Sequence, residues 1–340
     1  MGANDEVGLI GVGLVGSALA ERLTGAGLSV TAYDVDPAFG QAIAGLPVRS
    51  AASARDVAQA TGIVLLALPD TNATETVIGD IAPVLRAGTI LIDVSTDDPE
   101  RIASLAKTLV ERGVHLLDAP LSGSSVQIRA GDAVAIAGGD RNAFDDAAPV
   151  FNAISRHTFH LGPSGCGLRA KLATNLLLGL NRAALAEAVV FAEALGLDPS
   201  SFLAMARVTP AYSRAIDAKG EKMIARHYAP PESRVRQHRK DVALMLAAAA
   251  RLGCVMPWSE AHAALLDSAI AAGDGDLDSS AIIEDFAAAA SRLKSPGDAD
   301  IMRRVIIIEH MRHAARDSSG PLHWRIDRAS ANQHSHTRIE

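Results

Sequence analysis

Residues 8–16, GLIGVGLVG, constrain the fold of this chain more than any other part of its sequence. Three glycines stand there in the spacing G-x-G-x-x-G, directly after an apolar run typical of a strand and at the start of a helical pattern. Such glycines permit a tight turn, close approach of the backbone to a pyrophosphate, and close helix–strand packing. The segment predicts a strand–turn–helix unit that binds a nucleotide at the helix N-terminus, although glycine-rich turns also serve as plain connections.

Residues 1–163 continue this alternation of short apolar runs and amphipathic helical stretches. The helical patterns include 15–27 and 99–113. Several of the apolar runs are apolar on both faces, as in a parallel sheet that is covered by helices on each side. The pattern predicts a doubly wound α/β domain. The predicted strands are 6–13, 28–34, 62–69, 88–96, 114–123 and 132–139.

The pattern changes after residue 163. Residues 164–293 contain long Ala- and Leu-rich helical stretches and no convincing strand, which predicts an all-α second domain. Asp198 and Pro199 are typical of the N-cap and first position of one of its helices. Residues 294–340 end in a polar, His-rich, aperiodic stretch, and we expect this C-terminal extension to be partly disordered.

Composition excludes several classes of protein. The net charge of −7 argues against a nucleic-acid partner, which usually needs a basic patch. Two cysteines, Cys166 and Cys254, support neither a disulfide framework nor a metal cluster. We see no uninterrupted apolar stretch of about 18 residues and no basic, signal-like N-terminus. We therefore expect a cytoplasmic protein with no membrane partner and no metal.

Asp34 bears on which dinucleotide is bound. It ends the second predicted strand, 18 residues after Gly16, where an acidic side chain accepts hydrogen bonds from ribose hydroxyls and repels a 2′-phosphate. The residues that follow, VDP, offer no Arg or Lys for such a phosphate. This favours NAD over NADP. If Asp34 is a simple turn residue, the preference stays open.

Two further strand ends, ALPD at 67–70 and DVST at 93–96, fall at the carboxyl edge of the predicted sheet. Open α/β sheets bind their ligands at that edge. Pro69 and the pair Ser95–Thr96 are also common where strands end. The sequence alone therefore leaves two explanations for these residues: they end the strands in ordinary turns, or they contact a cofactor.

The segment GLRAKLATN, at 167–175, places Lys171 and Asn175 four residues apart on an apolar helix. Residues at this spacing share a face and can meet the same small molecule. A buried lysine loses solvation, so its pKa falls and it can exchange protons near neutral pH. Arg182 lies on nearly the same face, so the helix alone also permits a solvated polar stripe.

Two other segments are ambiguous by themselves. LSGSS, at 121–125, offers small residues and backbone N–H groups that suit an anion, but is equally typical of a turn. Lys240 lies in RVRQHRKD, which is also typical of a solvated basic run.

Four segments together resemble the β-hydroxyacid dehydrogenases, which include 3-hydroxyisobutyrate dehydrogenase, tartronate semialdehyde reductase and L-threonate dehydrogenase. The likeness spans about residues 7–293 and implies a Rossmann domain followed by an all-helical domain. The segments occur in the family's order: GLIGVGLVGSALAERL (8–23), DAPLSGSS (118–125), GCGLRAKLATN (165–175) and KDVALML (240–246).

The resemblance also implies roles for individual residues. Lys171 matches the catalytic lysine and Asn175 the asparagine that orients the substrate. Ser122, Gly123 and Ser124 match the loop that binds the substrate carboxylate. The implied cofactor contacts are Gly11, Val12, Gly13, Leu14, Val15, Gly16, Asp34, Leu68, Pro69, Thr96 and Lys240.

The chain departs from the family pattern at Ser124, at Gln127–Ile128 and at Thr174, which puts the identity of the acid in doubt. The resemblance implies an NAD-dependent dehydrogenase or reductase of a small 3-hydroxy acid or its semialdehyde, working as a homodimer or homotetramer. An imine reductase of the same architecture and a non-catalytic NAD-binding interaction module are the alternatives. The presence of Lys171 argues against both.

Overall fold

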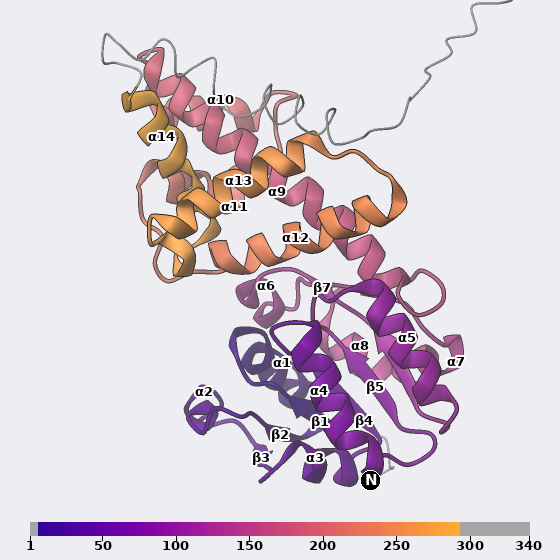
Figure 1. Cartoon of the computed structure of the whole chain (residues 1–340). Helices are drawn as coiled ribbons and strands as arrows, with labels where there is room; N and C mark the ends of the chain where they lie inside the picture. The colour runs from indigo at the N-terminus through magenta and orange to yellow at the C-terminus, as the bar shows by residue number, and fades with distance from the viewer. Residues whose placement is uncertain (1–5, 293–340) are drawn as a thin grey trace, which may run out of the picture. The chain divides into compact units, whose positions relative to one another are not determined.

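The structure, a computed structural model, describes residues 6–292, with side chains as far as residue 288. The predicted extension 294–340 lies outside the described residues. The first part of the chain forms a six-stranded, all-parallel sheet in the order β3-β2-β1-β4-β5-β6 (Figure 1). This is the strand order of a Rossmann domain. Its strands are β1 (Glu6–Ile10), β2 (Ser29–Tyr33), β3 (Val48–Ser50), β4 (Ile63–Leu66), β5 (Ile90–Asp93) and β6 (His115–Asp118).

Helices connect these strands and cover both faces of the sheet. They are α1 (Leu14–Gly25), α2 (Phe39–Ala42), α3 (Ala54–Ala60), α4 (Thr71–Ile81), the short η1 (Ala82–Val84) and α5 (Pro99–Val110). Successive strand residues point to opposite faces. In β4, Ile63 and Leu65 therefore join one core with α1, whereas Val64 and Leu66 join another with α3, α4 and α5. The predicted doubly wound α/β domain is confirmed.

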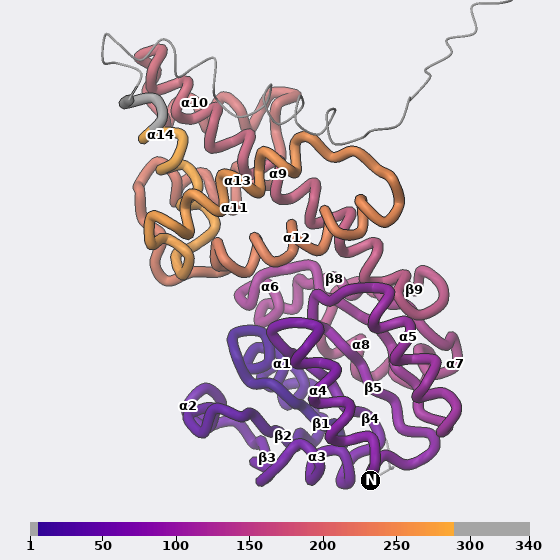
Figure 2. Tube along the Cα trace, viewed as in Figure 1, coloured from indigo at the N-terminus to yellow at the C-terminus, as the bar shows by residue number. Residues whose placement is uncertain are grey.

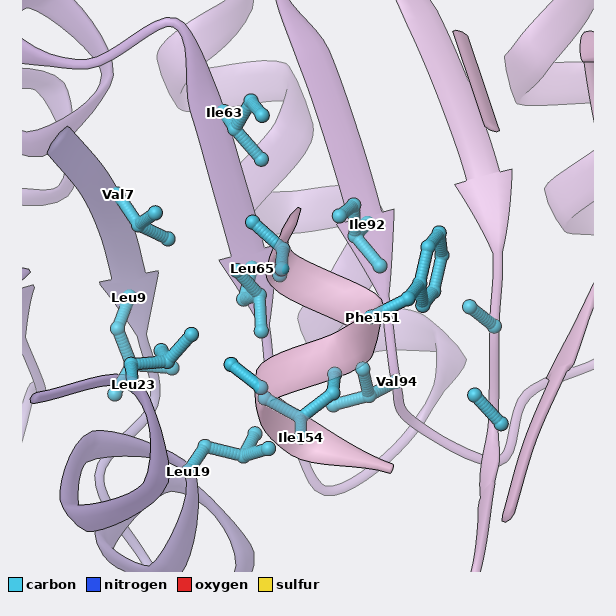
Figure 3. Packing of buried hydrophobic residues seen from close by; sticks show 14 of the residues in the cluster. Val7, Leu9, Leu19, Leu23, Ile63, Leu65, Ile92, Val94, Phe151 and Ile154 are labelled. Atoms are coloured by element: carbon cyan, nitrogen blue, oxygen red, sulfur yellow. The ribbon is translucent and has the colours of Figure 1, made fainter. Parts of the chain in front are cut away.

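Figure 3 shows the first of these cores at close range. Side chains of β1, β4 and β5 converge on Leu19 and Leu23 of α1 and on Phe151 and Ile154 of α8 (Ala148–Ile154). Phe151 is 2% exposed and Leu19, Leu23 and Ile154 are fully buried. Burial of such side chains contributes about 1.5–3 kcal/mol each, which holds α1, and with it the glycine turn, against the sheet.

A small second sheet was not foreseen. The predicted strand 114–123 divides at Pro120: β6 joins the main sheet, and β7 (Leu121–Ser122) pairs antiparallel with β8 (Val134–Ala137). Proline has no N–H to continue a ladder, which explains the division. β9 (His157–His160) pairs parallel with β8. The helices of this region are α6 (Ser125–Arg129), α7 (Arg141–Asp146) and α8.

Residues 166–292 form only helices among the elements described, as the sequence predicts. The course from β9 into α9 can be followed in Figure 2. Asp198 caps α10 by accepting from Ser201 N, and Pro199 begins that helix. The helices are α9 (Cys166–Ala194), α10 (Pro199–Arg207), α11 (Arg214–Ile224), α12 (Val235–Leu252), α13 (Pro257–Ala271), η2 (Asp274–Asp276), η3 (Ser279–Ile282) and α14 (Ile283–Arg292).

α9 organises this helical part. Its buried face includes Leu185 and Val189, which pack with side chains of α10 to α13 in one core. By length and composition alone, α9 is also long and apolar enough to cross a membrane, a test that the core helix of a soluble protein passes equally well.

Candidate active site

The glycine turn after β1 has the geometry that the spacing predicts. Gly11 has φ +93°, and a Cβ there would lie 2.3 Å from Ala67 O. A Cβ on Gly16 would lie 2.0 Å from Gly11 O, so both positions require glycine. A Cβ on Gly13, in contrast, would meet no atom within 4 Å, and α1 begins after Gly13 without a side-chain cap. An uncapped helix N-terminus beside open space fits the pyrophosphate of a dinucleotide.

Asp34 lies at the end of β2, beside this turn. One carboxylate oxygen accepts from Val12 N at 2.6 Å and the other from Asp36 N at 2.9 Å. The side chain therefore fixes the turn, and its partly exposed surface stays accessible to a ribose hydroxyl. The residues that follow it, Val35, Asp36 and Pro37, bring no positive charge.

The ends of β4 and β5 lie together. Leu68 N donates to Ser95 Oγ at 3.0 Å. The Lys240 amine, on α12, donates to Thr96 O at 2.6 Å and to Pro69 O at 3.3 Å. The structure thus brings together the predicted cofactor contacts Leu68, Pro69, Thr96 and Lys240, with the lysine bound to the backbone of both strand ends.

Lys171 lies on the second turn of α9 and is only 6% exposed. Its Nζ donates to Leu121 O at 2.7 Å. Burial lowers the pKa of Lys171 to about 8; the carboxylate of Asp241 opposes this shift and the charge of Lys240 adds to it. A pKa close to neutral lets the amine both accept and release a proton. The burial and the lowered pKa agree with the sequence-based expectation, and the solvated stripe is excluded at this position.

Asn175 is held by a residue that the sequence interpretation missed. Its Nδ2 donates to Asp241 Oδ2 at 3.0 Å, and Asp241 Oδ1 lies 3.3 Å from the Lys240 amine. Burial raises the pKa of Asp241, and the amines of Lys240 and Lys171 oppose that rise. Asp241 directly follows Lys240 in the segment KDVALML, so a second charge on a partly apolar helix was the available signal.

The loop at 122–124 begins with the last residue of β7, next to the Leu121 carbonyl that binds Lys171. Gly123 has φ +154°, a conformation that side chains rarely adopt. Ser124 caps α6: its Oγ accepts from Gln127 N at 3.3 Å, and its own N donates to Gln127 Oε1 at 2.8 Å. Both polar groups of Ser124 are therefore engaged with Gln127, whereas the Ser122 hydroxyl and the Gly123 amide have no such partner among the described residues. Of the three predicted residues, Ser124 is the least available to a ligand.

Asp118, which is fully buried at the end of β6, positions the start of α9. Its carboxylate accepts from Gly165 N at 2.7 Å and from Leu168 N at 2.9 Å. A Cβ on Gly167 would lie 2.3 Å from Ile136 O, so α9 begins in close contact with the small sheet. These contacts fix Lys171 one turn further along. The segment DAPLSG contains this aspartate, but no local pattern marks it as a residue of the site.

Comparisons with known proteins agree with this geometry. Residues 6–162 match the sequence model for the NAD binding domain of 6-phosphogluconate dehydrogenase. Residues 165–286 match the one described as NAD-binding of NADP-dependent 3-hydroxyisobutyrate dehydrogenase. Both descriptions are of NAD-binding domains, which confirms the predicted class of cofactor.

The alignments with individual relatives cover nearly the whole length of those proteins. The chain is 31% identical to 2-(hydroxymethyl)glutarate dehydrogenase of Eubacterium barkeri, over 82% of this chain and 94% of that protein. It is 29% identical to 2-hydroxy-3-oxopropionate reductase of Escherichia coli, over 82% and 96%. The crystal structure of 3-hydroxyisobutyrate dehydrogenase from Salmonella typhimurium aligns with a TM-score of 0.75 at 26% identity, over 82% and 99%. The likeness extends from the glycine turn through α9 to the last described helices, and the chain therefore belongs to the β-hydroxyacid dehydrogenase family of NAD-dependent oxidoreductases.

Proposed function

We propose that this enzyme oxidises a small 3-hydroxy acid, or reduces the matching semialdehyde, with Lys171 as the group that moves the proton. The observation that carries this proposal is a buried amine with a pKa of about 8, fixed 2.7 Å from Leu121 O beside the loop at 122–124. The substrates that we propose for this reaction are of the 3-hydroxyisobutyrate, glycerate or tartronate semialdehyde, or threonate type.

In the oxidative direction, neutral Lys171 Nζ accepts the proton of the substrate hydroxyl. In the reductive direction, the ammonium form donates that proton to the new alkoxide oxygen. When bound, NAD or NADH accepts or supplies the hydride at the neighbouring carbon. A buried amine suits this role because its two protonation states are nearly equal in free energy at working pH.

Asn175 orients the reacting oxygen. Its Nδ2 already donates to Asp241, which keeps the amide in one rotamer, so its carbonyl side or its second N–H is presented at a fixed place. Ser122 Oγ and the Gly123 amide bind the substrate carboxylate, and Ser124 supports the loop through its bonds to Gln127.

The part of the proposed cofactor site that would bind the adenosine ribose, around Asp34, favours NAD over NADP. A 2′-phosphate would approach the carboxylate of Asp34, and no arginine or lysine follows it in the turn. Residues 1–163 would form the NAD-binding domain in this proposal, and 164–293 would form the domain for substrate and dimerisation.

The working form that we propose is a cytoplasmic homodimer or homotetramer whose partners are small molecules, not nucleic acid or membrane. Several large apolar side chains of the helical part are exposed, which supports an interface between copies. Examples are Leu177, Phe191 and Trp258, which are 62%, 64% and 68% exposed.

The test is turnover of a panel of 3-hydroxy acids with NAD and, separately, NADP, following formation of the reduced nicotinamide. We expect at least one acid to be oxidised with NAD, and Lys171→Ala to lower kcat by about a hundred- to ten-thousand-fold. The exposed Lys107→Ala on α5 is the matched control and should keep full activity. Full activity of Lys171→Ala, or oxidation of none of the acids, would overturn the proposal. Reduction of cyclic imines in place of semialdehydes would favour the imine reductase alternative.

A further inference from the structure

Two buried carboxylates flank the predicted cofactor contact Thr96, and the mechanism proposed above does not use them. Asp93 is the last residue of β5, and Asp97 stands four residues later in the turn of residues 94–98, which leads to α5. Both side chains are fully buried. A carboxylate is almost never fully buried unless it is paired or gives up its charge by binding a proton.

Asp93 holds the backbone of this turn. Its Oδ1 accepts from Ser95 N at 3.0 Å. Ser95 Oγ accepts from Leu68 N at 3.0 Å, at the end of β4. The next residue, Thr96, accepts from the Lys240 amine of α12 through its carbonyl oxygen, at 2.6 Å. The carboxylate of Asp93 therefore fixes the start of the segment through which the turn meets both β4 and α12.

Asp97 connects the same turn to α4. Its Oδ1 accepts from the Thr71 hydroxyl at 3.3 Å, and Thr71 Oγ1 in turn accepts from Asp98 N at 2.9 Å. Thr71 is the first residue of α4. Asp98 caps α5 and pairs with Arg251 of α12 at 3.0 Å. Asp97 thus holds the turn against the start of α4, at the edge of the sheet where the cofactor contacts are predicted.

The second oxygen of each carboxylate lacks a donor. Asp93 Oδ2 and Asp97 Oδ2 are buried, and neither has a hydrogen-bond partner within the part of the chain that the structure describes. The two side chains act on each other at hydrogen-bonding range. Two carboxylates at such a range cannot both stay ionised. One proton on the pair turns the repulsion into a hydrogen bond, because a protonated carboxyl donates and an ionised one accepts.

The surroundings place this proton on Asp93. Burial and then the charge of Asp97 raise the pKa of Asp93 well above its usual range. Burial also raises the pKa of Asp97, but Asp93 and the hydroxyls of Thr74 and Thr71 oppose that rise. The positive charge of Lys240 on α12 opposes it too. The pair therefore carries one negative charge, on Asp97, and the Lys240 ammonium attracts it.

We propose that Asp93 and Asp97 form an acid pair that shares one proton, and that this pair positions the turn of residues 94–98 for the cofactor. Asp93 donates the proton to Asp97. When the proton is lost, the two carboxylates repel each other, and the turn that carries Ser95 and Thr96 is displaced. The pair acts through this turn and does not touch the reacting atoms. The inference rests on the proposed function, because it takes Thr96 as a cofactor contact.

The test is the pH dependence of NADH binding, followed by the fluorescence of the bound cofactor between pH 6 and 10. We expect the wild-type Kd to stay constant near neutral pH and to rise by at least about tenfold once the shared proton is lost. Asp93→Asn puts a side-chain N–H in place of this proton and keeps the acceptor for Ser95 N. It should retain the neutral-pH Kd and lose the alkaline rise. Asp93→Ala removes both groups and should weaken binding by about tenfold at every pH.

Asp80→Asn, on the surface of α4, is the matched control and should bind NADH as wild type does at every pH. Lys171 also changes its charge in this range, so the titration is repeated in Lys171→Ala, where the alkaline rise should persist. If it persists but no hydroxy acid is oxidised, the acid pair stands and the proposed reaction fails. The same alkaline rise in Asp93→Asn as in wild type, or a wild-type Kd that is constant over the whole range, would rule the acid pair out.

Infrared spectroscopy observes the shared proton directly. At pH 7 the wild-type protein should show a carboxylic acid C=O band that Asp93→Asn loses and Lys171→Ala keeps. Identical carboxylic acid bands in wild type and Asp93→Asn would show that Asp93 holds no proton. Asp93→Asn preserves the shape of the side chain, so we expect it to fold. Should it not, Asp97→Asn decides: its amide donates to Asp93 in place of the proton, so this variant should also lose the alkaline rise.

Discussion

Lys171 retains its proton less firmly than a lysine in water because the protein replaces most of its hydration. One bond to Leu121 O takes the place of several water molecules, and the side chain is 6% exposed. The negative charge of Asp241 keeps the ammonium form accessible despite this loss. The balance places the pKa near 8, where burial alone would carry it lower still.

This pKa predicts opposite pH dependences for the two directions of the reaction. Oxidation needs the neutral amine, so kcat with NAD should rise with pH and level off above about 8. Reduction needs the ammonium form, so kcat with NADH should fall as pH rises through the same range. Steady-state rates between pH 6 and 10 in both directions check this. In Lys171→Ala, we expect neither direction to show this pH dependence. Parallel pH profiles in the two directions would contradict it.

At this scale the sequence predicts some site residues and misses others. Lys171 and Asn175 stand out because their spacing and their apolar neighbours lie within one helix. Asp241 acquires its role only from its bond to Asn175, 66 positions away in the sequence. Arg182 left a solvated polar stripe open as an alternative, and the structure buries Nη1 of its guanidinium.

Among the elements, the start of α9 depends on an aspartate from another strand. Asp118 accepts from Gly165 N and Leu168 N, two donors that have no partner within the helix itself. Burial raises the pKa of Asp118, and the backbone N–H donors of α9 oppose that rise. The carboxylate thereby joins the end of β6 to the helix that carries Lys171.

Replacement of Asp118 should therefore affect both stability and activity. Asp118→Ala leaves two buried N–H groups unpaired, at about 1–3 kcal/mol each, and should lower the free energy of unfolding accordingly and reduce kcat. Asp140→Ala, which removes an ordinary N-cap from α7, is the control and should cost about 1 kcal/mol. Denaturant unfolding gives both values. Equal losses in the two variants would show that Asp118 has no special role.

Element boundaries show where local patterns stop being informative. The run 114–123 carries a strand pattern on both sides of Pro120, yet β6 and β7 belong to different sheets because a proline interrupts the ladder. β3 and β9 were missed because they are short and carry polar residues, such as Arg49 in β3 and the two histidines of β9. These strands form because their backbones pair with neighbouring strands, β3 with β2 and β9 with β8.

On the scale of the whole molecule, a buried ionic group ties η3 to α11 in the helical part. Asp278 is fully buried; it accepts from Lys219 Nζ at 2.9 Å, from Glu232 N at 2.9 Å and from Ser280 N at 3.0 Å. Burial by itself raises the pKa of Asp278, but the Lys219 ammonium and these donors outweigh it. The net result is a pKa well below the usual range.

This depressed pKa makes part of the stability sensitive to acid. The contribution of Asp278 is complete above the unfolded-state pKa of about 3.9 and is lost as pH falls toward the lower folded-state pKa. Asp278→Ala should lower the unfolding free energy at pH 7 by about 1–3 kcal/mol, since it leaves buried N–H donors such as Ser280 N without their acceptor, whereas the Lys219 ammonium keeps its pair with Glu232 at 3.1 Å. The variant should also lose less stability than wild type between pH 5 and pH 2. Denaturant unfolding of both proteins at several pH values in this range measures the difference. The same slope in both proteins would refute the assignment.

The sequence by itself determined the doubly wound α/β class followed by helices, the glycine turn, the NAD-type cofactor and the family, because these depend on short-range patterns and motifs. It also brought Lys171 and Asn175 together, since four residues on a helix fix their spacing. Only the tertiary structure decided how charges are shared at the site. Which carboxylate meets which amine depends on packing between α9, α12 and the strand ends. That Asp241 binds Asn175 and Asp278 binds Lys219 is visible only in the tertiary structure.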